Sequence, residues 1–480
     1  MYLSDWIVES DIESMQRAME KGEVCSVDLV EAYLQRIHKF DPLLHSVLEM
    51  NPDAAQIARF LDEERKEKGK RGLLHGIPIL LKDNIDTKDA MHTSAGSLAL
   101  AGTVAREDSA VAARLREAGA VLLGKTNMTE WANYMSGSMW AGYSARGGLT
   151  LNPYGPGELF VGGSSSGSAV AVAANFAAAA VGTETSGSII SPSSQNNLVG
   201  IKPTIGLVSR TGIIPITRSQ DTAGPIARTV ADAAALLGAL VGTDPKDEAT
   251  LLATNRMKQD YTAYLDKSFL KRSRIGIPRY YYRNLDEARL SIVEQAISAL
   301  RDHGATIVDP VSLSCEQTKW EWNVLRYEFK KYVNDYLGSL SEDAPVHSLA
   351  EVIDFNNKYA EAALKYGQNL LIWAEQTSGT LTEEEYFASL KLNESARRGI
   401  DQALEQHELD ALLFLGNEGG ADLAARAGYP SITVPGGYIT KGPQGITFVG
   451  TAFSEPTLIK LAYGFEQLTK HRYAPRFKAR

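Results

Sequence analysis

Hydrophobic positions along the chain follow two alternating patterns. Short apolar runs that end in turn residues are typical of buried strands, and they occur at 73–82, 121–127 and 410–416. Residues 108–120 lie between the first two runs and carry a helical pattern, which gives a strand–helix–strand order. We therefore expect an α/β fold with a mixed, mostly parallel β-sheet sandwiched between helices.

The first 70 residues have a helical pattern of their own. Ser10 and Glu13 have the spacing of a capping box at the start of a first helix, which ends near Gly22. Ser26 is the expected cap of a second helix. Four apolar residues of that helix recur at helical spacing, and they are Leu29, Ala32, Tyr33 and Ile37. We expect an N-terminal helical hairpin over about 1–70.

The composition changes once along the chain. Residues 254–406 are richer in charged and aromatic residues and read mostly as amphipathic helices, whereas strand patterns return after 408. No repeat or low-complexity linker separates these parts. We expect one domain over 1–480, with a core at about 71–250 and 408–480 and a variable helical cap at about 254–406.

Charge and cysteine content exclude several classes of function. The 480 residues carry a net charge of −9 without a basic or acidic block, so we expect no nucleic-acid or membrane partner. The two cysteines, Cys25 and Cys315, form no metal-spaced pair and suggest a reduced, cytoplasmic protein. The N-terminus has no signal-peptide pattern, and the apolar run 169–181 is too short to span a bilayer. We expect this run to be a buried helix.

The most unusual stretch is 162–188, GGSSSGSAVAVAANFAAAAVGTETSGS, in which two Ser/Gly clusters bracket an Ala/Val run. Serines among glycines can present hydroxyls and bare backbone N–H groups to a reacting carbonyl. A pair of turns that flank a core helix would give the same pattern. A phosphate-binding loop is excluded, because Ser168 stands where that motif requires lysine.

One interpretation makes Ser165 the nucleophile, since residues 163–167 match the GxSxG motif of α/β-hydrolases. That motif needs a preceding strand and a downstream histidine. The later histidines lie in or beside helix-patterned segments, and no HGGG-type oxyanion loop is present. This interpretation stays open as an alternative.

A second interpretation makes Ser188 the nucleophile. The backbone N–H groups of Thr185, Ser186, Gly187 and Ser188 would then face the oxyanion. No histidine is close in sequence, so the candidate base is Lys82, at the end of the apolar run 73–82. Burial would lower its pKa from about 10.4 toward the ~7–8 that suits a general base.

Six segments resemble, in order and spacing, the amidase signature family, and most closely its peptide amidase-like branch. The match extends from about 26 to 232 and returns at 427–435 and near the C-terminus, whereas the helical part between them matches poorly. The segments are LHGIPILLKDNIDT, GKTNMTEWA, VGGSSSGSAVAVAA, GTETSGSI, GIKPTIGLVSRTGIIP and SQDTAGPIARTVADAA.

The resemblance implies an amidase that forms an acyl-enzyme on Ser188. Lys82 would be the base, and Ser164, which follows a cis peptide bond in the family, would bridge the proton between them. No metal or cofactor is implied. Further residues are expected to hold the lysine and the loops by hydrogen bonds, namely Asp83, Asn84, Thr126, Asn127, Ser165 and Asp221.

Two departures from the family pattern bear on the substrate. Family members that bind a carboxylate place an Arg two or three positions after the nucleophile, where this chain has Ile190 and Ser191. A buried carboxylate would lack a cationic partner, so we expect a neutral amide: aryl, alkyl or C-terminal peptide amide, with esters or carbamates as side substrates. Ser186 replaces the Asp that is usual in the branch, which leaves the substrate open.

Three matters remain open at this stage. The chain could instead be the glutaminase subunit of a tRNA-dependent amidotransferase, or a catalytically inactive scaffold protein. We expect a small-molecule amide as partner and a monomer or homodimer. Five aromatic residues of the helical part would line either a pocket or the core, and they are Tyr280, Tyr281, Tyr282, Trp320 and Trp322.

Overall fold

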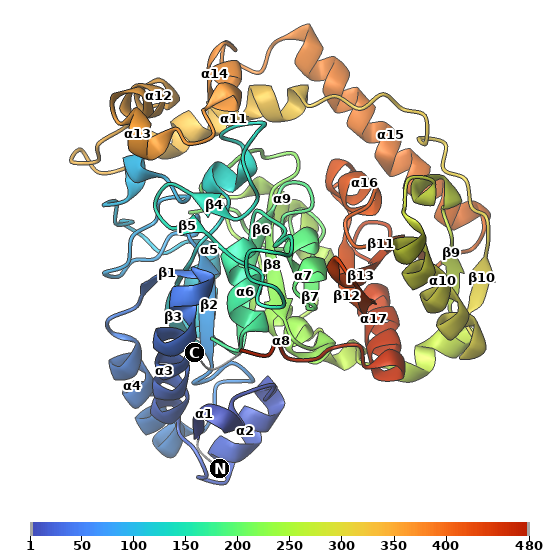
Figure 1. The fold of residues 1–480 in the computed structure, drawn as a ribbon, viewed down its shortest axis with the longest axis horizontal. Helices are drawn as coiled ribbons and strands as arrows, with labels where there is room; N and C mark the ends of the chain where they lie inside the picture. The colour runs from blue at the N-terminus through green and yellow to red at the C-terminus, as the bar shows by residue number, and fades with distance from the viewer. Residues whose placement is uncertain (1–2, 478–480) are drawn as a thin grey trace.

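The computed structural model describes residues 3–477 and is built around one eleven-stranded sheet (Figure 1). The strand order is β1-β3-β2-β6-β8-β7-β12-β13-β11-β9-β10, and β4 with β5 forms a separate ribbon. The strands are β1 Val47–Met50, β2 Pro78–Lys82, β3 Val121–Thr126, β4 Tyr143–Ser144, β5 Gly148–Leu149, β6 Ala179–Glu184, β7 Val199–Lys202, β8 Thr222–Ala227, β9 Arg274–Gly276, β10 Thr306–Val308, β11 Ala411–Leu415, β12 Ser431–Ile439 and β13 Gly442–Val449.

The α/β class and the mixed sheet are confirmed, but parallel pairing does not predominate. In the described chain, parallel pairs join β2 to β3 and β6, and β9 to β10 and β11. The centre of the sheet, from β6 through β8, β7, β12 and β13 to β11, is antiparallel. The expectation came from the first strand–helix–strand unit, and the later strands pair by other connections.

Helices flank this sheet. A row formed by α5, α8, α17 and α10 packs along it, while α6 and α7 pack on the strands from β2 to β13. No helix within residues 3–477 has the length and apolar character needed to cross a membrane. The helices are α1 Leu3–Trp6, α2 Ile12–Glu20, α3 Ser26–Leu44, α4 Ala54–Lys68, α5 Ala110–Glu117, α6 Ser166–Ala173, α7 Ile190–Gln195, α8 Val230–Leu240, α9 Glu248–Ala253, α10 Glu287–Asp302, α11 Asn323–Leu337, α12 Leu349–Lys358, α13 Ala360–Ala363, α14 Asn369–Glu375, α15 Glu384–Gln406, α16 Gly420–Ala427 and α17 Glu455–Thr469.

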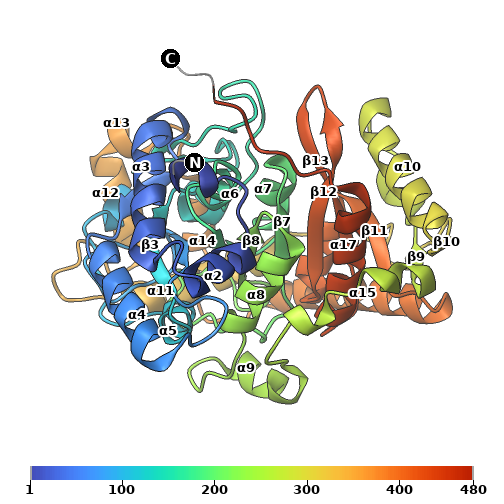
Figure 2. The same cartoon turned by 90° about the horizontal axis from the view of Figure 1, so that it is seen from below.

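The N-terminal segment is more than the expected hairpin. It contains α1 to α4, and β1 joins the edge of the sheet beside β3. The cap of α2 is Asp11, which accepts a hydrogen bond from the backbone N–H of Ser14, so the expected Ser10 capping box is wrong. Figure 2 shows these helices at one end of the sheet and α10 with β9 and β10 at the other.

The Ala/Val run 169–181 is not one helix, and this expectation is also wrong. Helix α6 ends at Ala173, Asn175 adopts a left-handed conformation with φ of 60°, and the chain returns as β6 from Ala179. Alanine favours helices locally, but β6 is paired on both sides, with β2 and β8. Tertiary pairing therefore overrides the local preference.

Helices α11 to α15 lie together along one side of the molecule (Figure 1). Buried side chains of α11, α12, α14 and the start of α15 form a second hydrophobic cluster with the segment that follows β3, and this cluster is separate from the core of the sheet. Ring contacts within it join Phe329 of α11 to Trp131 and Tyr134. The helical part thus packs directly on the loop that continues from β3.

Candidate active site

Lys82 is the last residue of β2 and is completely buried. Its Nζ lies 2.8 Å from Oγ of Ser164, 2.9 Å from Oγ1 of Thr183 and 3.2 Å from the carbonyl oxygen of Thr183. Burial lowers the pKa of Lys82 to about 7. The nearby carboxylates of Asp221 and Glu184 act in the opposite direction and raise this pKa, but their effect is smaller. A large fraction of Lys82 is therefore neutral at neutral pH.

Ser164 and Ser165 differ in their surroundings although they are adjacent. A cis peptide bond joins Gly163 to Ser164, as the resemblance implied, and the Ser164 hydroxyl meets Lys82. Ser165 is fully buried, and its hydroxyl bonds to the carbonyl and the N–H of Thr183. Ser165 therefore fixes the start of α6 against β6.

The GxSxG interpretation is wrong. Residues 160–163 form no strand in the described chain, so the strand before the motif is absent. The hydrogen bonds of Ser165 Oγ go to the backbone of Thr183, and no histidine takes part in them. The Ser165 hydroxyl therefore both donates to and accepts from the backbone of Thr183, and Ser165 has no exposed surface.

Ser188 lies in the turn between β6 and α7. Its carbonyl oxygen accepts a hydrogen bond from the N–H of Ser165, which ties the two Ser/Gly clusters together. The carboxylate of Glu184 accepts from the N–H groups of Ile189 and Ile190, at 2.7 and 3.0 Å. In the part of the chain that the structure describes, the N–H groups of Ser186, Gly187 and Ser188 donate to no protein acceptor.

A cavity of about 620 Å³ opens in front of this turn. Gly163, Thr185, Ser186 and Ser188 line it on the side of the turn, and within residues 3–477 no charged side chain lines it. The remaining lining residues come from the segment after β3, from Ile216 and from the helical part, and they are Ala132, Asn133, Tyr134, Ser136, Gly137, Met139, Ile216, Trp322, Leu325, Asn369, Leu370 and Trp373.

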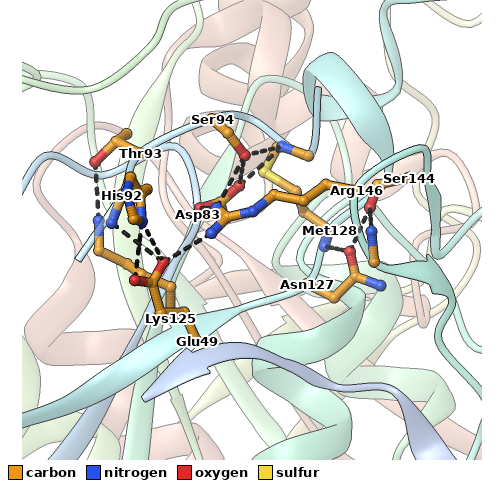
Figure 3. A network of polar contacts seen from close by, with 12 residues as sticks. Glu49, Asp83, His92, Thr93, Ser94, Lys125, Asn127, Met128, Ser144 and Arg146 are labelled. Atoms are coloured by element: carbon orange, nitrogen blue, oxygen red, sulfur yellow. Dashed lines mark hydrogen bonds and ion pairs between the residues drawn. The ribbon is translucent and has the colours of Figure 1, made fainter. Parts of the chain in front are cut away.

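Asp83 follows Lys82 and lies in a polar network (Figure 3). Its carboxylate accepts from Nη1 of Arg146 at 3.0 Å, from the N–H of Gly96 at 2.9 Å and from the Ser94 hydroxyl. Figure 3 shows Arg146 reaching from Asp83 to Glu49, which it meets at 2.7 Å. The network thus anchors the residue next to Lys82.

The other predicted supporting residues hold neighbouring loops. Asn84 donates to the Thr183 hydroxyl at 3.0 Å, and the Thr126 hydroxyl bonds to that of Ser168 at 2.7 Å. Asp221 accepts from the Thr185 hydroxyl at 2.5 Å and from the N–H groups of Ile216 and Thr217, and burial raises its pKa to about 6. Asn127 Nδ2 donates to Thr150 and to the backbone of His45 and Gly148.

Only one of the five predicted aromatic residues lines the cavity. Trp322 does so at its rim, where its side chain is half exposed. Trp320 instead packs against Arg426, and Tyr281 packs against Phe414. Tyr282 donates to the carbonyl of Leu413 and is buried in the sheet core, and Tyr280 stacks with Arg283.

Sequence reasoning did not identify several residues of the site. Thr183, which contacts Lys82 twice, sits inside the recognised motif but carries no separate signal. Asn369 and Trp373 come from the part of the chain that matched the family poorly.

Within residues 3–477, no three His, Cys, Asp or Glu side chains gather as metal ligands.

Comparison with known proteins gives the class of this enzyme. The family model for amidases matches residues 28–414, and the chain belongs to the amidase signature family. A probable amidase of Arabidopsis thaliana is 44% identical over 98% of this chain and 92% of its own length. The native peptide amidase of Stenotrophomonas maltophilia is 46% identical, with a TM-score of 0.89 over 98% of this chain and 99% of that one.

A second peptide amidase structure, in complex with the competitive inhibitor chymostatin, is 47% identical with a TM-score of 0.90, over 98% and 99% of the two chains. The protein is therefore an amidase, which confirms the expected enzyme class.

Proposed function

We propose that this amidase hydrolyses neutral carboxylic amides through an acyl-enzyme on Ser188, with Lys82 as the base and Ser164 as the proton bridge. The observation that carries the proposal is the 2.8 Å contact between Lys82 Nζ and Ser164 Oγ, beside a cavity that Ser188 lines. Two serines and a buried lysine in this arrangement can activate a hydroxyl without imidazole.

The contacts of Lys82 suit the neutral amine. A neutral Nζ has two N–H groups and one lone pair, and Thr183 supplies two acceptors, its carbonyl oxygen and its hydroxyl. In this neutral form the lone pair is left for the hydroxyl proton of Ser164, whereas the charged ammonium donates to Ser164 Oγ. The lowered pKa, about 7, keeps this form populated at neutral pH.

Proton transfer and bond formation follow one path. Lys82 takes the proton of Ser164 while Ser164 takes that of Ser188, and Ser188 Oγ attacks the amide carbonyl carbon. The N–H groups of the turn 185–188 stabilise the oxyanion. The C–N bond then breaks as Ser164 returns a proton to the leaving nitrogen. Water hydrolyses the resulting ester to a carboxylic acid and restores the Ser188 hydroxyl.

The cavity supports a neutral acyl group. Its walls combine Trp322, Leu325, Leu370 and Trp373 with uncharged polar residues such as Asn133 and Asn369, and no charged side chain of the described residues lines it. A carboxylate bound there would lose its hydration without gaining a cation. Its size and the similarity to peptide amidases favour C-terminal peptide amides over small alkyl amides. The neutral lining also counts against a dedicated glutaminase, whose substrate carries charged groups.

A substrate panel tests the proposal. Release of ammonia or amine is measured with an N-acetylated peptide amide, an aryl amide, an alkyl amide and an amide whose acyl group carries a carboxylate. We expect turnover of the neutral compounds only, loss of activity in Lys82→Ala, and nearly full activity in His471→Ala. Activity in Lys82→Ala together with its loss in His471→Ala would refute the assigned base.

A further inference from the structure

Arg426 of α16 is the buried centre of a polar cluster that also contains Asp422, whose side chain is 32% exposed. The Arg426 side chain is 2% exposed, and its Nε donates to Oδ2 of Asp422 at 2.9 Å. Its Nη1 donates to the carbonyl of Glu321 and to Oδ1 of Asn393, at 3.0 and 3.2 Å. Five donors held in one plane let the guanidinium satisfy several acceptors at fixed angles.

Two chains of hydrogen bonds run from Arg426 to the turn that precedes Ser188. In the first, Oδ1 of Asp422 accepts from the hydroxyl of Ser186 at 3.2 Å. In the second, Nδ2 of Asn393 donates to Oε1 of Gln220 at 3.1 Å, and Nε2 of Gln220 donates to the carbonyl oxygen of Thr185 at 3.2 Å. Both chains therefore end on adjacent residues of one turn.

Arg426 also contacts the cavity wall. Its guanidinium lies 4.9 Å from the ring centre of Trp320 and 5.0 Å from that of Trp322, and Trp322 lines the cavity. Neither Arg426 nor Asp422 lines the cavity itself. These two residues therefore act on a substrate only through the residues that they hold.

We propose that Asp422 and Arg426 are positioning residues that fix the turn 185–188 so that its N–H groups face the oxyanion. This inference rests on the proposed function. Such a role favours the transition state over the bound substrate, because the ground-state carbonyl depends less on the placement of the donors than the oxyanion does. Loss of the contact should lower kcat and leave KM nearly unchanged.

The experiment is a double-mutant cycle of Ser186→Ala and Asp422→Ala. Removing one oxyanion donor costs ~10²–10³-fold in kcat, so a donor that is only displaced should cost about 10-fold. We expect kcat to fall about 10-fold in each single variant. The double variant should show the same fall as a single variant, because both substitutions remove the same hydrogen bond. Losses that multiply in the double variant would overturn the inference.

Asp401→Ala is the matched control. Asp401 of α15 accepts from the hydroxyls of Tyr429 and Thr451, and so joins α15 to segments near α16 without reaching the turn. We expect this variant to keep its kcat. If it loses as much kcat as Asp422→Ala, the effect is a general loosening of α15 and α16, and the inference is wrong.

A pair of ligands separates positioning from direct substrate contact. A peptide aldehyde adds to the serine and places an oxygen in the oxyanion position, whereas the matching peptide alcohol only fills the cavity. Both single variants should bind the aldehyde about 10-fold less tightly and the alcohol as well as the wild type. Weaker alcohol binding by Ser186→Ala alone would make Ser186 a substrate contact and overturn the inference.

The two proposals fail in different ways. An active wild-type enzyme with unchanged aldehyde binding in both variants overturns the positioning role alone. A wild-type enzyme whose Ser188→Ala variant keeps full amidase activity overturns the proposed function, and the positioning role with it.

Discussion

Nζ of Lys82 and Oγ of Ser164 lie 2.8 Å apart, although 82 positions separate the two residues. The sheet brings them together, because β2 pairs with β6 and Ser165 at the start of α6 bonds to Thr183 of β6. The end of β2 therefore meets the turn that precedes α6. This contact puts a buried amine beside a hydroxyl whose proton it can accept.

The pH dependence of kcat/KM should report the lysine. Lys82 must be neutral to accept a proton, so kcat/KM should rise with pH and level off above an apparent pKa near 7. An unperturbed lysine would place this rise near pH 10.4 instead. The measurement is a kcat/KM profile from pH 5 to 10 on a neutral amide. A rise centred near pH 10 would contradict the burial argument.

Ser164→Ala should remove the proton bridge without unfolding the protein. Because general acid–base catalysis contributes ~10²–10⁴-fold, we expect a kcat loss in that range. Ser168→Ala is the matched control, since Ser168 is an equally buried serine of α6 whose hydroxyl bonds to Thr126. It should cost about 1 kcal/mol of stability and keep its kcat. Equal activity losses in the two variants would argue against a bridging role.

Arg146→Met should destabilise the fold, because Asp83 has no exposed surface and would lose the cation that contacts it directly. Removing one partner of a buried ion pair costs about 3–5 kcal/mol. Burial already raises the pKa of Asp83, and without Arg146 the folded-state pKa rises further. A carboxyl group whose pKa is higher in the folded than in the unfolded state makes the folded state less stable as pH rises. The loss of unfolding free energy in Arg146→Met should therefore be larger at pH 8 than at pH 5.

Thermal unfolding at these two pH values measures that deficit. Arg17→Met is the control, since the Arg17–Glu13 pair is exposed, and it should change the melting temperature little. A deficit that is the same at both pH values would contradict the assignment to Asp83.

Gly167→Ala should test how tightly α6 packs under the site. A Cβ at Gly167 would lie 2.3 Å from the carbonyl oxygen of Asn127 and 2.4 Å from that of Ser46. Both are backbone atoms, so relief requires a shift of the chain and should cost about 1–3 kcal/mol or more. Gly102→Ala, where a Cβ meets no atom within 4 Å, should unfold at the wild-type temperature. Equal melting temperatures for Gly167→Ala and the wild type would show that α6 can move to make room for the Cβ.

Much of the fold follows from local patterns. The run that ends at Lys82, the helix at 110–117 and the strand at 121–126 are each recognisable, because apolar periodicity reports burial directly. The Ala/Val run misled for the same reason: alanine fits both states, and only pairing of β6 with β2 and β8 decides between them. The balance of parallel and antiparallel pairs likewise depends on distant segments.

The sequence predicted only part of the candidate active site. The residues themselves suggested Ser188 and Lys82 as one of two options, and the family resemblance added Ser164. Asp422, Asn369 and Trp373 reach the site from helices far along the chain, and no local pattern marks them. Their contribution depends on how α14 and α16 pack, which periodicity alone does not specify.

The most direct test of the mechanism is the site of covalent modification. The native protein is treated with a fluorophosphonate, digested, and the modified peptide is identified by mass spectrometry. We predict a single adduct on Ser188, undiminished in Ser165→Ala and absent in Ser188→Ala. An adduct on Ser165, or an unmodified Ser188 in folded wild-type protein, would contradict the account.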